Sequence, residues 1–531
     1  MGCFLGLDSS TQSLSAMVVD TDQKRIVLDE SLNFGKELPA YASPHGVLPN
    51  ADPAIRHSDP LMWVEALELL LGRVKAKFDL ARVDGISGAG QQHGSVYLKR
   101  PLSELGGWKL DASLVDQVRP LLSRPTAPMW MDSSTGRQLR EIAQAAGGAD
   151  EVRKISGSIP IERFTGPQIR KYWQEEPERY ESTGEIQLVS SFMASLLIAG
   201  SAPIDRGDAA GMNLFDLAKD DWSQLLLDAT APGLRSKLSK PVASSTVVGK
   251  ISDYFVRRFG FRSGVPVVAF SGDNPSSLVG MGACEPENRV ISLGTSDTMF
   301  AAMPKPTTDP NGYGHVFGNP AGGFMSLLCF TNGSLARERV AQHFGLSWEE
   351  FSRALEQQSS PGNDGNVMLP FFTPETAPRL GQAGVELFGS QRFVALEDAP
   401  SAVRAVVEAQ MLLLQRYSDW IGHLPKQLLV TGGASRNQAI LRVIADVFQT
   451  PVRVLSIANA SALGGALRAA QALGGSAWRD LFAVFVTPDA NLKLEPNAAA
   501  GAAYEKLKPE LYARVDERLA NGAPRSAARG L

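Results

Sequence analysis

The sequence predicts an α/β protein with two domains, and three observations lead to this prediction. Segments rich in Val, Ile and Leu alternate with segments of helical periodicity along the chain. The length of 531 residues is too great for a single hydrophobic core. The pattern of strand, polar turn and strand that opens the chain begins again after residue 264. We therefore expect two halves of similar construction.

The composition excludes several classes of protein. Hydrophobic residues make up 44% and charged residues 20%, and the net charge is -4, which gives no sign of a nucleic-acid or acidic membrane partner. No apolar run has the length of a membrane span, and the first residues lack the features of a secretory signal. Cys3, Cys284 and Cys329 form neither a disulfide framework nor a metal-binding pattern. We expect a cytoplasmic protein.

The first element is predicted to be a hairpin with an unusually polar tip. Two apolar runs, "CFLGLD" and "LSAMVVD", flank hydroxyl and amide side chains where Gly, Asn or Pro would make a simpler turn. Ser10 and Thr11 can donate to phosphate oxygens, and Asp8 can hold a hydrated Mg²⁺. The alternative is that the hydroxyls only cap their own backbone, which we favour for any such turn taken alone.

Helices and strands alternate after this hairpin. Residues 59–78 predict a helix with Asp59 as N-cap and Pro60 in the first turn. Residues 82–90 then predict a strand that runs into a Gly-rich loop with Gln92 and His93. Side chains that both donate and accept hydrogen bonds suit a polyol, although a lone His is more often structural. A mixed amphipathic region, roughly 215–263, follows as a connector.

The second half repeats this arrangement. A strand in "GVPVVAFSGDN" ends at Asp273 and Asn274, where ligand groups collect in open α/β sheets. Asp273 can accept a proton from a substrate hydroxyl, or it can be the N-cap of the next helix, and the residues alone do not decide between these. The hairpin "RVISLGTSDTMFAAM" has a second polar tip at Gly294 and Thr295. Two such tips can hold a triphosphate between them.

A Gly pair marks the next junction between a strand and a helix. In "TGGASRN" the helix N-terminus and its backbone amides can lie against a nucleotide. The chain has neither a Rossmann fingerprint nor a Walker A motif, so this signal is weak by itself. From about residue 488 the chain is rich in Ala, Lys and Glu and predicts a helix.

Taken together, these motifs resemble those of the FGGY carbohydrate kinases. They occur in the family's order between residue 4 and about residue 473. The quoted segments are "LGLDSSTQS", "GISGAGQQHGSVY", "PMWMDSST", "ERFTG", "SGDN", "ISLGTSDT", "TNGSLARE" and "TGGASRNQAILRVIADVF". Within the family the similarity is greatest to the eukaryotic-type branch that phosphorylates D-xylulose. The chain lacks the Arg-Glu-Thr pattern that glycerol kinases carry at the position of Gln91 to Gly94.

The resemblance implies two actin-like (ribonuclease H-like) domains of the sugar kinase–heat-shock–actin superfamily with a central cleft. A sugar-binding domain would span 1–262 and a nucleotide-binding domain 263–478, with the chain crossing back at its end. The C-terminal tail, 479–531, is predicted to be helical and receives no functional assignment. ATP and Mg²⁺ are the implied cofactors. The oligomeric state stays open, with a homodimer as one option.

The resemblance also implies roles for individual residues. Asp273 would be the general base that takes a proton from the 5-hydroxyl of D-xylulose, and Asp8 would bind Mg²⁺ through water. The implied sugar contacts are Gln92, His93, Arg163, Asp273 and Asn274. The implied nucleotide contacts are Asp8, Ser10, Thr11, Gly294, Thr295, Trp348, Gly432, Gly433, Ala434 and Asn437.

Three alternatives are open at this point. The first is a kinase for another acceptor, such as ribulose, gluconate or a deoxy-ketose. The second is a sugar-binding pseudokinase, which the retained Asp8 and Asp273 argue against. The third is an actin- or chaperone-type ATPase that acts on protein partners. Such a protein needs a further domain, for which the tail is too short, since domains mostly have about 100–150 residues.

Overall fold

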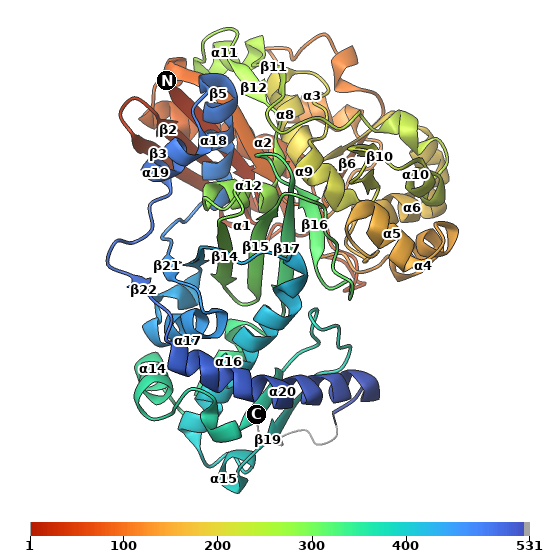
Figure 1. Cartoon of the computed structure of the whole chain (residues 1–531). Coiled ribbons are helices and arrows are strands. Elements are labelled where there is room, and N and C mark those ends of the chain that lie inside the picture. The colour runs from red at the N-terminus through yellow and green to blue at the C-terminus, as the bar shows by residue number, and fades with distance from the viewer. Residues whose placement is uncertain (1, 525–531) are drawn as a thin grey trace.

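Two large mixed sheets form the centre of the molecule, and helices cover them (Figure 1). The computed structural model describes residues 2–524. The first sheet has the strand order β11 (Val247–Lys250), β12 (Pro266–Val268), β5 (Val83–Gly90), β1 (Cys3–Ser9), β2 (Ser13–Asp20) and β3 (Arg25–Asn33), and β13 (Ser271–Gly272) also pairs with β5. The hairpin β1–β2 is antiparallel, whereas β1 and β5 run parallel.

The second sheet repeats this pattern. Its strand order is β16 (His315–Gly318), β17 (Phe324–Phe330), β15 (Asp297–Met303), β14 (Asn288–Leu293), β20 (Gln427–Thr431), β21 (Val452–Val454) and β22 (Lys493–Leu494). The hairpin β14–β15 is antiparallel and β14 runs parallel to β20, as β1 does to β5. The two polar-tipped hairpins therefore occupy equivalent places in the two sheets, as the sequence predicts.

Helices fill the space around the sheets. In the first half the main ones are α2 (Pro60–Lys77), α4 (Gly136–Ala145), α6 (Thr165–Glu175), α8 (Val189–Ile198) and α12 (Asp273–Gly280). In the second half they are α13 (Ser334–His343), α14 (Trp348–Gln357), α16 (Ala399–Ser418), α17 (Gln438–Phe448), α18 (Ala460–Gly474) and α20 (Ala498–Asn521). Asp59 caps α2 by accepting a hydrogen bond from Leu61, as predicted. None of the helices within residues 2–524 is both long and apolar enough to span a bilayer.

Helix α18 joins the two halves. It follows the second sheet in the chain but packs on β1, β5 and α12 of the first half (Figure 1). Gly280 and Gly464 permit this contact. A Cβ atom at Gly280 would lie 1.9 Å from the carbonyl oxygen of Ala460, and one at Gly464 would lie 1.9 Å from that of Ser276. Any side chain at either position would push α12 and α18 apart.

The strand pairing bears on where the first half ends. A boundary at residue 262 would separate β12 and β13 from β5, to which both are hydrogen-bonded. A division after α12 keeps the first sheet whole, so the pairing favours it. At the other end of the chain, α20 packs on α16 and α17. There the guanidinium of Arg416 donates to both carboxylate oxygens of Asp516, at 2.7 and 2.9 Å.

Candidate active site

A cavity of about 640 Å³ lies in the second half beside the turn that follows β20. Six of the predicted nucleotide contacts line it, namely Gly294, Thr295, Trp348, Gly433, Ala434 and Asn437. The structure thus brings together residues that are up to 143 positions apart in the chain (294 to 437).

Local geometry fixes the walls of this cavity. Gly432 has a φ of 91°, and a Cβ there would lie 2.5 Å from the carbonyl oxygen of Leu293, so the turn can approach β14 only with glycine. Asn437 caps α17, and its side-chain amide donates to the hydroxyl of Ser352 at 2.8 Å. Trp348 is 50% exposed at the start of α14, which leaves a face of its ring free to stack on a base.

A second cavity, of about 430 Å³, lies beside the first hairpin and includes Gly432, next to Gly433 of the first cavity. Asp8 and Ser10 line it, together with the hydroxyl side chains of Ser13, Ser15, Ser277, Ser292, Thr298, Thr431 and Ser461. The Ser10 hydroxyl lies 3.1 Å from both the backbone and the side-chain oxygen of Ser13, a local contact of the self-capping kind, and its role toward phosphate stays a prediction.

Asp8 has the properties of a cation ligand. Its side chain is buried, and its Oδ1 has no hydrogen-bond partner within residues 2–524. Burial raises the pKa of Asp8 to about 8, and the nearby charge of Asp273 adds to this effect. A buried carboxylate with an unpartnered oxygen fits a hydrated Mg²⁺ that faces a phosphate chain. No group of three His, Cys, Asp or Glu side chains in the described part of the chain can hold a metal, so the ion would keep water and phosphate oxygens as ligands.

Asp273 is the first residue of α12, and Gly272 is the N-cap, so the N-cap alternative for Asp273 is wrong. Its Oδ1 accepts two hydrogen bonds from Asn274, from the backbone N–H at 2.8 Å and from Nδ2 at 3.0 Å. Burial raises the pKa of Asp273 to about 6, and the backbone N–H groups of Asn274 and Gln92 limit the rise. These bonds from Asn274 leave the other carboxylate oxygen, Oδ2, to accept a proton.

Gln92 lies behind Asn274. Its Oε1 accepts a hydrogen bond from Asn274 Nδ2 at 2.8 Å, and its side chain is 2% exposed. The amide of Asn274 therefore donates to Gln92 and to Asp273, and only its Oδ1 is left to accept a hydrogen bond from a ligand. Gln92 thus orients Asn274, and its own Nε2 has no hydrogen-bond partner within residues 2–524, so a direct contact with the sugar stays a prediction.

His93 presents one ring nitrogen as an acceptor. Its Nδ1 lies 2.7 Å from the carbonyl oxygen of Gly211, which makes Nδ1–H the donor and leaves Nε2 unprotonated. Burial lowers the pKa of His93 to about 3, and the charge of Arg163 contributes, so the ring is neutral. Its φ is 71°, and the ring packs edge-on against Phe164 with centroids 4.8 Å apart.

Arg163 lines a third cavity of about 520 Å³ with Trp130, His315 and Arg379. The half-buried guanidinium of Arg163 makes no hydrogen bond or ion pair within residues 2–524, and burial lowers its pKa. An unpaired guanidinium beside a cavity is available to donate to ligand oxygens.

Asp208 is a buried acid that the sequence analysis does not identify. It accepts a hydrogen bond from the hydroxyl of Ser190 at 2.5 Å, and its Oδ1 lies 2.9 Å from the place of a Cβ at Gly272. Burial raises the pKa of Asp208 well above the usual carboxyl range. The segment "DRGDAAG" carries no pattern that would have revealed this location.

Comparison with known proteins decides the family. Residues 3–280 match the N-terminal domain of the FGGY family of carbohydrate kinases, and residues 289–473 match its C-terminal domain. The chain belongs to the FGGY family of carbohydrate kinases. The first match ends at the last residue of α12, in agreement with the strand pairing.

Named relatives of this FGGY kinase cover nearly its whole length. "Xylulose kinase" of Mus musculus is 41% identical over 538 residues, which is 98% of this chain and 95% of the relative. "Xylulose kinase 2" of Arabidopsis thaliana is 43% identical over 88% of this chain and 86% of the relative. The solved structure of xylulose kinase from Rhodospirillum rubrum has a TM-score of 0.82 at 20% identity, with 98% and 99% of the two chains covered. The predicted two-domain kinase fold is therefore confirmed.

Proposed function

We propose that this FGGY kinase transfers the γ-phosphoryl group of ATP to the 5-hydroxyl of D-xylulose. The observation that carries this proposal is the similarity to relatives described as xylulose kinases in a mammal and a plant, at 41% and 43% identity. The membership of a carbohydrate kinase family makes ATP the phosphate donor.

Asp273 is the general base in this proposal. The 5-hydroxyl oxygen forms a bond to the γ-phosphorus while the bond from that phosphorus to the bridging oxygen of ADP breaks. The hydroxyl proton passes to Oδ2 of Asp273, because Asn274 occupies Oδ1. A pKa of about 6 leaves this carboxylate ionised at neutral pH but more basic than an ordinary one.

Three polar groups of the candidate site suit a polyhydroxy acceptor. Nε2 of His93 and Oδ1 of Asn274 are free to accept hydrogen bonds, and the guanidinium of Arg163 is free to donate them. A ketose offers both hydroxyl donors and oxygen acceptors, and a buried group left unpaired is costly. This set therefore favours a sugar over an apolar alcohol.

The nucleotide is placed across the two hairpin tips. The adenosine lies in the first cavity against Trp348, and the phosphates extend past Gly294 and Thr295 toward Ser10, which lines the second cavity, and toward its neighbour Thr11. Mg²⁺, when bound, would neutralise charge on the phosphates beside Asp8. Asp8 would contact the ion through water. A cytoplasmic location and a homodimer remain predictions from the sequence.

The test is ADP release from Mg·ATP with a panel of acceptors. D-xylulose, D-ribulose, L-ribulose, L-xylulose, D-fructose, glycerol and gluconate are compared by kcat/KM. We expect a clear preference for D-xylulose. A preference for another member would overturn the choice of sugar, and ATP binding without turnover of any of them would overturn the assignment as a xylulose kinase.

A further inference from the structure

The loop that carries Trp130 contacts the tip of the first hairpin. The indole Nε1–H of Trp130 donates to the hydroxyl of Thr11 across 2.8 Å. An indole N–H can only donate, so the hydroxyl must accept, and its own proton points away from the indole. No other hydrogen bond of this hydroxyl is present within residues 2–524. Thr11 therefore keeps one donor for a ligand.

The backbone at Thr11 is fixed. The N–H of Ser10 donates to the carbonyl of Ser13 at 3.0 Å, and the N–H of Phe34 donates to the carbonyl of Gln12 at 2.9 Å. Gly46 lies against the tip with a φ of 75°, and a Cβ there would lie 1.7 Å from the carbonyl oxygen of Thr11. The backbone that carries the Thr11 hydroxyl is thus held in place, and the indole of Trp130 is the contact that orients this hydroxyl.

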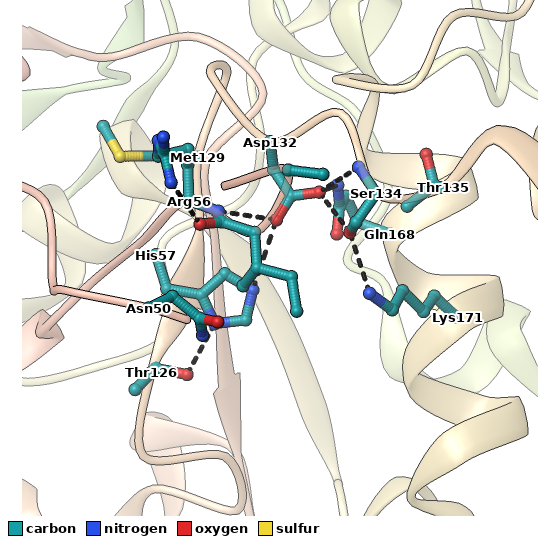
Figure 2. A network of polar contacts seen from close by, with 12 residues as sticks. Asn50, Arg56, His57, Thr126, Met129, Asp132, Ser134, Thr135, Gln168 and Lys171 are labelled. Carbon is teal, nitrogen blue, oxygen red and sulfur yellow. Dashed lines mark hydrogen bonds and ion pairs between the residues drawn. The ribbon is translucent and has the colours of Figure 1, made fainter. Parts of the chain in front are cut away.

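Asp132, two residues after Trp130, is held by a network of polar contacts (Figure 2). Its Oδ1 accepts hydrogen bonds from the N–H and hydroxyl of Ser134 and from Nε2 of Gln168, at 2.9, 2.6 and 2.8 Å. Its Oδ2 accepts from the N–H of Arg56 at 2.9 Å and lies 3.5 Å from Nε2 of His57. Burial alone would raise the pKa of Asp132, but these hydrogen bonds lower it overall.

This network anchors a loop whose tryptophan is partly exposed. Trp130 lies two residues before Asp132, and 40% of its surface is exposed. Its side chain lines the third cavity beside Arg163, while its N–H meets Thr11 of the phosphate hairpin. The Trp130 side chain therefore faces the cavity that Arg163 lines and also contacts the hairpin tip that carries Thr11.

We propose that Trp130 is a positioning residue that directs the hydroxyl proton of Thr11 to the γ-phosphate of ATP. The proposal rests on the placement of Thr11 at the phosphates in the proposed function. It does not depend on which sugar is the acceptor. Loss of the contact between Trp130 and Thr11 should weaken the binding of ATP but not of ADP, because only a nucleotide with a γ-phosphate meets the oriented hydroxyl.

The experiment is a double-mutant cycle on nucleotide binding. Isothermal titration calorimetry gives the Kd values of Mg·AMP-PNP and Mg·ADP for the wild type, Trp130→Phe, Thr11→Val and the double variant. Trp130→Phe should weaken AMP-PNP binding by about 3- to 10-fold, the range that one hydrogen bond provides, and leave ADP binding unchanged. The double variant should bind AMP-PNP no more weakly than Thr11→Val. Thr11→Ser keeps the hydroxyl and should bind like the wild type.

Trp222→Phe is the matched control. The indole N–H of Trp222 donates to the carbonyl of Ser239 at 2.7 Å, and Trp222 lines none of the three cavities. This variant alone should leave the ratio of the AMP-PNP and ADP affinities as in the wild type, and combined with Thr11→Val it should give the ratio of Thr11→Val alone.

Two results would overturn the proposal. One is an unchanged affinity of Trp130→Phe for AMP-PNP. The other is a double variant whose fold-loss of AMP-PNP affinity equals the product of the fold-losses of Trp130→Phe and Thr11→Val. The result of this cycle can be told apart from the result of the acceptor panel that tests the proposed function. If the cycle shows coupling but no sugar of the panel is phosphorylated, the positioning role stands and the assigned acceptor fails.

Discussion

Arg337 binds Asp297 through two parallel hydrogen bonds, Nη1 to Oδ2 at 2.8 Å and Nη2 to Oδ1 at 2.9 Å. Asp297 begins β15 directly after the polar tip of the second hairpin, and both side chains are buried. Oε1 of Gln410 accepts a further bond from Arg337, and its Nε2 donates to the carbonyl of Gly333 at 2.9 Å. The pair thus fixes the tip of the second hairpin to α13 and α16.

Loss of one partner of this pair should be strongly destabilising. Arg337→Met leaves the Asp297 carboxylate buried without its counter-charge, which costs about 3–5 kcal/mol of unfolding free energy. Urea denaturation followed by circular dichroism measures this loss. The double variant Arg337→Met/Asp297→Leu should recover much of it, because no charge is left unpaired. Equal stability of Arg337→Met and the wild type would show that the pair contributes little.

Replacement of the proposed base should remove turnover but not binding. Asp273→Asn keeps the shape of the side chain and abolishes proton acceptance, so kcat should fall by about 10²- to 10⁴-fold. Calorimetry should give sugar and nucleotide affinities close to those of the wild type. Asp208→Asn is the control, because it replaces a second buried acid near Asp273 that has no role in the proposed transfer, and it should change kcat little. If Asp273→Asn kept most of the turnover, the base would have to be sought elsewhere.

The pH profile should report the same carboxylate. Asp273 acts only when it is ionised, and its pKa lies at about 6, so kcat/KM for the sugar should fall as the pH drops through this value. Nδ2 of Asn274 donates to the ionised form and so favours it. Asn274→Ala should therefore move the acid limb to higher pH, as rates between pH 5 and 9 would show. An acid limb of Asn274→Ala at lower pH than that of the wild type would contradict this effect of Asn274 on the pKa of Asp273.

The stability of the nucleotide-free protein should depend on Asp8. Its pKa is raised to about 8 by burial, so between the ordinary carboxyl range and pH 8 the folded state holds a proton that the unfolded state has lost. The unfolding free energy therefore decreases as the pH rises through this window, by at most ~1.4 kcal/mol per unit. Asp8→Asn removes this dependence. Thermal melts without Mg²⁺ should show a higher Tm for Asp8→Asn than for the wild type, with a larger difference at pH 8.5 than at pH 5. The same difference in Tm at both pH values would contradict this role of Asp8.

The sequence alone predicts the parts of the fold and site that local patterns determine. The alternation of apolar and polar residues marks both hairpins, and Asp59 with Pro60 marks the start of α2. Gly432 and Gly433 mark a turn where the backbone must come close to β14. Asp273 lies at the end of a strand of the first sheet, where ligand groups were expected.

Partners that are distant in the chain could not be predicted. Gln92 and Asn274 are 182 residues apart, and Thr11 and Trp130 are 119 apart, so no local periodicity connects them. A Trp in a Pro-rich loop can equally be a packing residue or a wall of a binding site. Only the folded arrangement shows that its N–H has a hydroxyl partner.

The central claim is sugar phosphorylation by transfer from ATP to the 5-hydroxyl. The most direct measurement is ADP release from Mg·ATP with D-xylulose as the single acceptor, with the product examined by ³¹P and ¹H nuclear magnetic resonance. We predict release that requires the sugar and a product with its phosphate on the oxygen of carbon 5. ADP release at the same rate without sugar, or a phosphate on another oxygen, would contradict the account.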